Sequence, residues 1–269
     1  MRIQHQGFNI IILILSGITV AYIVYPLVTI FIFIEPVSPS KLLESITRPQ
    51  VGNAFVLSLI SATISTLLLS LFGIPLGYFL ARYDNFPGKF VLQIIVLIPL
   101  VLPPLASGAL LLGVFGPYSP LVQAFPGIEF TQSILGVIIA QTYVASPFMI
   151  LAGQAAFESV DESYENVARV LGRSRVETFF KVSLPLAKTG VVIGFIMSWV
   201  RAIGELGATM MMAYNPHTIS IQIFEDNAIG GLRQAVSSII LVIPLSIIAV
   251  VVFYFTTTIR KKQEILKQT

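Results

Sequence analysis

Few side chains in this 269-residue chain could carry out chemistry inside its long apolar segments. Only Arg201 and Glu205 are ionisable there, and both belong to the segment that we expect to form the fifth membrane span. A spacing of four places both residues on one face of a helix. Charged residues inside a membrane span usually mark a transport pathway, a gate or a buried pair. A structural pair, with Gly204 and Gly207 allowing close helix packing, is the alternative, and the two roles can coexist.

The sequence offers little other chemistry. It has no phosphate-binding Walker motif, because Gly88-Lys89 lacks both the upstream glycine and the following Ser or Thr. It contains no HExxH or GxSxG motif, no Cys, and only two His that are far apart in sequence. We therefore expect no catalytic residue, no metal site and no cofactor in this chain.

Prolines interrupt the apolar segments at several points. A single proline such as Pro26 is tolerated in a membrane helix without any functional role. The cluster of Pro99, Pro103 and Pro104 is different, because the backbone groups that it frees must be satisfied by neighbouring helices or water. For this cluster we favour a broken helix that lines a pathway.

The stretch from Glu158 to Lys188 is far more polar than its surroundings, with five of the 13 acidic and five of the 16 basic residues. Its apolar residues recur at helical spacing, which predicts a short amphipathic helix. These residues are Val160, Tyr164, Val167, Ala168 and Leu171. Gly172 lies where a left-handed C-terminal cap belongs, and we expect a second short helix that Pro185 closes. Periodicity does not decide between a docking surface for a soluble partner and a hydrated connecting loop.

Composition places the chain in a membrane. It is 55% hydrophobic and 11% charged, and its mean hydropathy is +0.88, well outside the range of soluble proteins. Six apolar segments predict an all-α integral membrane protein formed by one transmembrane domain, residues 1–269. The expected spans are 9–34, 51–81, 90–115, 131–157, 185–213 and 236–259, with the charged hairpin at 158–185.

Basic residues predict the orientation of these spans. The N-terminus, the second and fourth connections and the C-terminal tail hold twelve Lys and Arg: Arg2, Arg82, Lys89, Arg169, Arg173, Arg175, Lys181, Lys188, Arg260, Lys261, Lys262 and Lys267. The opposite side holds three: Lys41, Arg48 and Arg233. This bias predicts that both termini and the hairpin are cytoplasmic. It also accounts for the net charge of +3 without nucleic acid as a partner.

The hairpin resembles the EAA loop of the permease subunits of ABC importers. The shared features are Asn166-Val167-Ala168, a glycine at 172 and Leu184-Pro185. The family's Glu and first Ala are replaced here by Asn166 and Val167, and we expect Glu165 to substitute in part. The resemblance implies that an ATPase subunit couples to Glu165, Asn166, Val167, Ala168, Arg169, Gly172, Leu184 and Pro185.

A narrower resemblance covers about residues 53–237. The run from Arg201 to Thr209 is similar to a signature of molybdate, tungstate and sulfate permeases, and the proline cluster followed by Ser107-Gly108 and the segment Gln141-Thr142-Tyr143 agree with it. The residues that we expect at the translocation pathway or gate are Pro103, Pro104, Ser107, Thr142, Arg201, Gly204, Glu205, Gly207 and Thr209.

The resemblance implies a type I ABC importer permease in the cell membrane. Such a subunit homodimerises around a central pathway, and two copies of a nucleotide-binding subunit, which hold the ATP and Mg, dock on its hairpins. An extracytoplasmic binding protein delivers the oxyanion, with molybdate or tungstate expected first and sulfate next. The alternative is an ion-coupled secondary transporter or a channel, which needs carboxylates near the midplane, and Glu205 is the only candidate. A structural or assembly membrane protein is a more remote alternative.

Overall fold

The structure is a computed structural model that describes residues 2–34, 40, 47–83 and 86–268. Lys41, which was counted for the orientation, lies outside these residues. Throughout the described ranges the regular elements are helices, as the composition predicted. Their bounds are α1 (Arg2–Ile34), α3 (Pro49–Arg82), α4 (Lys89–Val101), α5 (Pro104–Phe115), α6 (Pro120–Ala124), α7 (Ile134–Glu158), α8 (Ser163–Val170), α9 (Arg175–Thr178), the π-helical turn η1 (Phe179–Ser183), α10 (Leu184–Ile203), α11 (Gly207–Met212) and α12 (Ile219–Gln268).

Six helical segments of the described chain are long and apolar enough to cross a membrane, which confirms the expected class. They are Ile12–Thr29, Pro49–Arg82, Pro104–Ala124, Ile134–Glu158, Arg175–Ile203 and Ile219–Thr258. The expected third span, 90–115, is divided between α4 and α5. The break is at Leu102 and Pro103, whose extended backbone ends one helix and precedes the next. The broken helix predicted from the proline cluster is therefore present.

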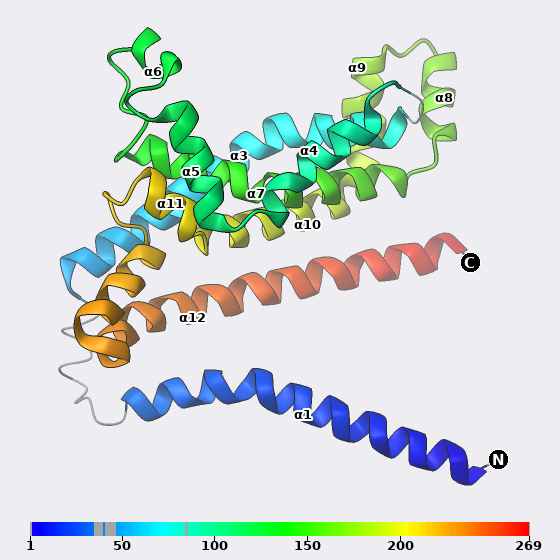
Figure 1. Cartoon of the computed structure of the whole chain (residues 1–269). Coiled ribbons are helices and arrows are strands. Elements are labelled where there is room, and N and C mark those ends of the chain that lie inside the picture. The colour runs from blue at the N-terminus through cyan, green and yellow to red at the C-terminus, as the bar shows by residue number, and fades with distance from the viewer. Residues whose placement is uncertain (1, 35–39, 41–46, 84–85, 269) are drawn as a thin grey trace.

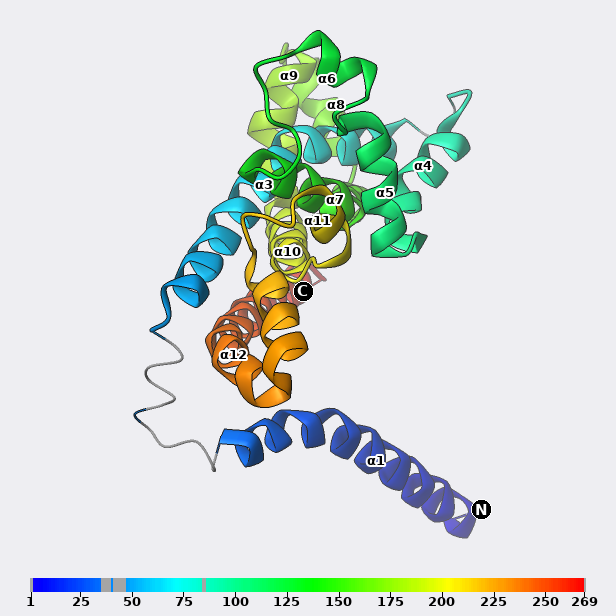
Figure 2. The same cartoon turned by 60° about the vertical axis from the view of Figure 1, so that its left-hand side comes forward.

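Two expected boundaries were wrong. Pro185 does not close a helix, because α9 continues through η1 into α10 and Pro185 lies in the first turn of α10. The fifth span does not run on to residue 213, since α10 ends at Ile203 and α11 is a separate short helix. The last element, α12, consists of two helices that meet at Gly231, whose φ of 66° is non-helical, and the chain turns sharply within α12 (Figure 2). The expected sixth span, 236–259, lies within the second of these helices.

The centre of the molecule is the packing of α3 and α10 against α7. The buried face of α3 is rich in small residues, which lets neighbouring helix backbones approach closely. Its buried small residues include Ala54, Ser58, Ser61, Ala62, Ser65 and Thr66. Larger apolar side chains such as Leu69, Met149 and Ile203 fill the space between the three helices. This packing supplies a rigid frame for both ends of the bundle.

The two ends of the bundle carry different elements (Figure 1). The short helices α8 and α9 lie at one end, and the N-terminal end of α1 and the C-terminal end of α12 point the same way. The short helix α6 lies at the opposite end. Helix α1 lies beside α12, away from the other helices in both views, and its described side chains are almost all exposed. Its apolar surface is the kind that lipid or a second protein chain covers.

Candidate functional site

The charged hairpin begins with α8, whose end is defined by a Schellman motif. The amide of Arg173 donates to the carbonyl of Ala168 at 3.1 Å, and the amide of Gly172 donates to the carbonyl of Arg169 at 3.0 Å. Gly172 has a φ of 84°, the left-handed conformation predicted from the sequence. Residues with a Cβ are strained in that conformation. Gly172 therefore sets the direction in which the chain leaves α8.

Local hydrogen bonds also define the start of α9. Ser174 and Glu177 form a capping box, in which each side chain accepts a hydrogen bond from the other residue's backbone amide. Lys181 and Arg173 lie 3.1 and 3.0 Å from the Glu177 carboxylate. The Glu177 carboxylate accepts hydrogen bonds from Lys181, the Ser174 backbone amide and Arg173. These two cations are thus engaged within the hairpin.

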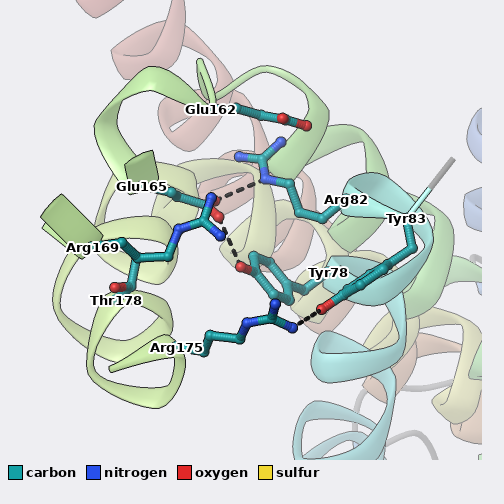
Figure 3. Close-up of a pocket in the computed structure, with 8 residues that line it drawn as sticks. All are labelled: Tyr78, Arg82, Tyr83, Glu162, Glu165, Arg169, Arg175 and Thr178. Carbon is teal, nitrogen blue, oxygen red and sulfur yellow. Dashed lines mark hydrogen bonds and ion pairs between the residues drawn. The ribbon is translucent and has the colours of Figure 1, made fainter. Parts of the chain in front are cut away.

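Glu165 anchors the hairpin to the bundle (Figure 3). Its side chain is buried, and its carboxylate accepts hydrogen bonds from Arg82 Nε and from the Tyr78 hydroxyl, each at 2.8 Å. Burial alone would raise the pKa of Glu165. The hydrogen bonds from Arg82, Tyr78 and Ser183, together with the positive charge of Arg82, outweigh this effect of burial. The pKa of Glu165 therefore lies below its ordinary value. The carboxylate faces α3, so Glu165 can contribute to docking only by holding the hairpin in place.

An aromatic cluster packs around Tyr78, beside the Arg82–Glu165 ion pair. The ring of Tyr78 meets Phe157 edge-on at 5.1 Å and Phe179 at 4.9 Å between ring centroids. Phe157 is fully buried, and Leu184 packs against the same cluster. Tyr78 therefore connects the ion pair of the hairpin to the apolar core between α3, α7 and η1.

The outer face of the hairpin is apolar and exposed. The apolar face predicted for α8 is divided, because Val160 and Ala168 are buried whereas Tyr164, Val167 and Leu171 are not. The exposed large apolar side chains of the hairpin are Tyr164, Val167, Val170, Leu171, Val176 and Phe180, and Val170 is 87% exposed. Among the predicted coupling residues, Asn166, Arg169, Gly172 and Pro185 are also exposed, and Leu184 is half-buried. An exposed apolar patch with a charged rim is typical of a protein–protein contact.

The second predicted group surrounds the break between α10 and α11. Glu205 Oε2 lies 2.7 Å from Arg201 Nη1, and Glu205 Oε1 accepts a hydrogen bond from the Ala208 amide at 2.7 Å. The Glu205 side chain is 1% exposed and that of Arg201 27%. The ion pair thus forms although α10 ends at Ile203 and Gly204 caps it. Glu205 bonds to both helices across the break.

Helix α11 lies directly against α5. A Cβ on Gly207 would lie 2.7 Å from Pro104 Cβ and 2.9 Å from the Leu105 amide nitrogen, so only glycine fits there. This contact brings together the predicted residues of the two segments, with Pro103 and Ser107 on one side and Thr209 on the other. The broken helix and the signature after Arg201 therefore form one structural unit.

Buried polar atoms without a hydrogen-bond partner gather on the membrane helices. Such atoms each cost about 1–3 kcal/mol unless a water or ligand satisfies them. In the described part of the chain they are Ser107 Oγ, Gln141 Nε2, Thr142 Oγ1, Ser198 Oγ and Thr209 Oγ1. Ser107, Thr142 and Thr209 were predicted as pathway residues. Gln141 was noted only as part of a motif, and a lone Ser such as Ser198 gave no signal.

The Arg48–Asp226 ion pair, at the end of the bundle opposite the hairpin, was not predicted from the sequence. Asp226 is buried and lies 3.0 Å from the guanidinium of Arg48. Its carboxylate also accepts hydrogen bonds from Gln222 and Ser238, at 3.1 and 2.8 Å, so it links the two parts of α12 on either side of Gly231. Asp226 was overlooked because the last span was expected to begin ten residues after it. The described residues contain no group of three or more potential metal-ligating side chains.

Comparisons with known proteins agree with this geometry. Residues 73–264 match the family model described as "Binding-protein-dependent transport system inner membrane component". The chain is 38% identical to a probable molybdenum ABC transporter permease protein of Haloferax volcanii, covering 94% of this chain and 92% of the relative. It is 37% identical to the molybdate/tungstate transport system permease protein WtpB of Thermococcus kodakarensis, covering 87% and 89%.

A solved structure shares the fold. It is the crystal structure of a bacterial alginate ABC transporter in complex with an alginate pentasaccharide-bound periplasmic protein, with a TM-score of 0.72 and 15% identity over 96% of this chain and 95% of that one. At this identity the likeness concerns the architecture alone. The family match covers most of the chain. The chain therefore belongs to the family of inner membrane components of binding-protein-dependent transport systems.

Proposed function

We propose that this chain is the membrane-spanning subunit of an ATP-driven importer of tetrahedral oxyanions. Molybdate or tungstate is the first candidate substrate, and sulfate is the second. The observation that carries the proposal is the similarity, along nearly the whole chain, to permease proteins named for molybdenum, molybdate and tungstate. The Arg201–Glu205 pair and the unpartnered buried hydroxyls support it, because a dianion needs a route that attracts it without trapping it.

The hairpin is the proposed contact with the ATPase. A separate nucleotide-binding subunit, present in two copies, holds ATP and Mg, so the chain itself is not an enzyme. The exposed apolar face of α8 and α9 meets this partner, while the Arg82–Glu165 pair transmits the movement to α3. The remaining coupling residues, from Asn166 to Arg169 with Gly172 and Leu184-Pro185, shape or support that contact.

The other partners follow from the same proposal. A second copy of this chain completes a central pathway, lined by the segments that carry Ser107, Thr142 and Thr209 and gated around Gly204 and Gly207. An extracytoplasmic binding protein delivers the oxyanion at the end opposite the hairpin. The hairpin and both termini are cytoplasmic, which fits the excess of Lys and Arg on that side.

The test is reconstitution. The chain is placed in proteoliposomes with its ATPase subunit and its binding protein, and uptake of molybdate, tungstate and sulfate is measured with and without ATP. We expect ATP-dependent uptake that requires the binding protein and stops when the catalytic carboxylate of the ATPase subunit is replaced. Uptake that instead follows an ion gradient in the absence of ATP would favour an ion-coupled secondary transporter, for which Glu205 is the candidate ion site.

A further inference from the structure

A small polar cavity of about 130 Å³ lies between the hairpin and the end of α3 (Figure 3). Its walls come from the C-terminal end of α3 and from α8 and α9, which lie about 80 residues further along the chain. Arg82, Arg169 and Arg175 all line it, and Glu162 and Glu165 contribute the only carboxylates among the described lining residues. The space is sufficient for several water molecules or one small anion.

Within the part of the chain that the structure describes, two of the three arginines have no carboxylate partner. The Arg82 charge is balanced by Glu165 at 2.8 Å. In contrast, Arg169 donates to the side-chain oxygen of Asn166, and Arg175 Nη1 donates to the Tyr83 hydroxyl at 3.1 Å. Both acceptors are neutral, and a guanidinium has five N–H donors, so most of the donors of Arg169 and Arg175 remain available.

The orientation of these side chains favours an anion between them. Figure 3 shows the guanidinium groups of Arg169 and Arg175 approaching Tyr78 from α8 and from α9. Both guanidiniums line one cavity, and phosphate-like oxyanions accept pairs of parallel hydrogen bonds from such planar groups. The Tyr78 hydroxyl donates its single hydrogen to Glu165, so it is not counted as a donor to the anion.

We propose that this cavity is a binding site for a tetrahedral oxyanion, such as phosphate, sulfate or molybdate, with Arg169 and Arg175 as its ligands. An anion held by both arginines would connect α8 to α9 and would stiffen the turn at Gly172. Glu162, on the same wall, opposes the anion and sets a limit on its affinity. If the proposed import function is correct, the imported oxyanion reaches this site from the cytoplasm and acts as a product signal on the hairpin.

The site can be tested without transport or the ATPase subunit. The full chain is purified into nanodiscs of phosphatidylcholine and titrated calorimetrically with sulfate, molybdate and phosphate. We expect one anion per chain, with affinity reduced about tenfold or more in an Arg169→Gln/Arg175→Gln variant, because two charge-assisted contacts are lost. Glu162→Gln should strengthen binding. A tetrahedral phosphate can also come from lipid, so discs that contain phosphatidic acid are compared. If phosphatidic acid competes with the added anion, a lipid headgroup is the occupant. If it does not compete, the free anion is the occupant.

The matched control removes the same number of charges from the same hairpin. Arg173 and Lys181 both pair with Glu177 and do not line the cavity, so Arg173→Gln/Lys181→Gln should bind with unchanged affinity. Equal weakening in this control would mean that only the overall charge matters. Three outcomes would overturn the proposal: equal weakening in the control, undiminished binding in the Arg169/Arg175 variant, and no binding at millimolar anion. None of these outcomes depends on whether the chain imports an oxyanion.

Discussion

The guanidinium of Arg82 lies 2.8 Å from the carboxylate of Glu165, although 83 residues separate the two in the sequence. Both side chains are 7% exposed. Arg82 is the last residue of α3, a helix that passes through the centre of the bundle, whereas Glu165 belongs to the hairpin. The ion pair therefore connects the hairpin directly to the central helix.

Removal of either partner should loosen the hairpin. Arg82→Gln and Glu165→Gln each leave a buried charge without its partner, and we expect a loss of roughly 3 kcal/mol for either change. The double variant should lose less than the sum of the two single changes. Thermal unfolding of the purified chain measures these losses. Arg173→Gln, which breaks an exposed pair, should cost about 0–1 kcal/mol. Equal effects from the exposed and the buried pair would contradict the anchoring role of Glu165.

Acid should release the hairpin through Glu165. Its pKa in the folded chain is lowered, so its contribution to stability is complete above its unfolded pKa of about 4.3 and is lost as the pH falls through the folded value. Glu165→Gln should therefore speed the hydrogen exchange of α8 at neutral pH, and this difference should shrink as the pH falls below about 4.3. The comparison of both proteins at each pH removes the contributions of Asp161 and Glu177. A constant difference at all pH values would exclude Glu165 as the titrating group.

A β-branched residue at Gly172 should uncouple the hairpin from its partner. Open space surrounds this position, so Gly172→Val acts through backbone strain of about 1–2 kcal/mol rather than through a clash. The turn should shift and tilt α8, which reduces co-purification of the ATPase subunit while the chain stays in the membrane. Gly172→Asn, which tolerates the left-handed conformation, is the control and should keep the complex. Normal recovery of the complex with Gly172→Val would argue against the hairpin as the docking element.

The Arg201–Glu205 pair should behave as a coupled unit. Arg201→Gln and Glu205→Gln should each reduce oxyanion uptake or membrane insertion severely, because breaking a buried pair typically costs about 3–5 kcal/mol. The double variant should recover part of that loss. The amount of inserted protein and the uptake are measured for all four proteins. Strictly additive losses would mean that the two residues are independent, despite their 2.7 Å contact.

The orientation can be tested with reporter fusions. Fusions after Lys89, after Lys188 and at the C-terminus should report a cytoplasmic location, and fusions after Arg48 and Ile128 an external one. The physical reason is the concentration of Lys and Arg on one side of the membrane. Two consecutive fusion sites that report the same side would refute the six-span arrangement.

The class of this protein and much of its local structure were predictable from the amino-acid sequence. Apolar segments long enough to cross a bilayer follow from composition alone, since a bilayer of fixed thickness demands them. The left-handed turn at Gly172 and the break beside Pro103 were predictable as well, because glycine and proline act on the backbone locally.

Which polar side chains meet depends on how the helices pack. No local pattern predicts the pairing of Glu165 with Arg82, or of Asp226 with Arg48, because the partners lie on helices that are distant in sequence. In the packed structure Glu165 is buried, whereas Val167 and Leu171 are exposed. The amphipathic pattern of α8 predicts the reverse, with the apolar residues buried and the charged residue exposed. Short-range spacing predicts contacts within one helix, such as Arg201 with Glu205, whereas contacts between helices are fixed by the close approach of small residues that no local pattern reveals.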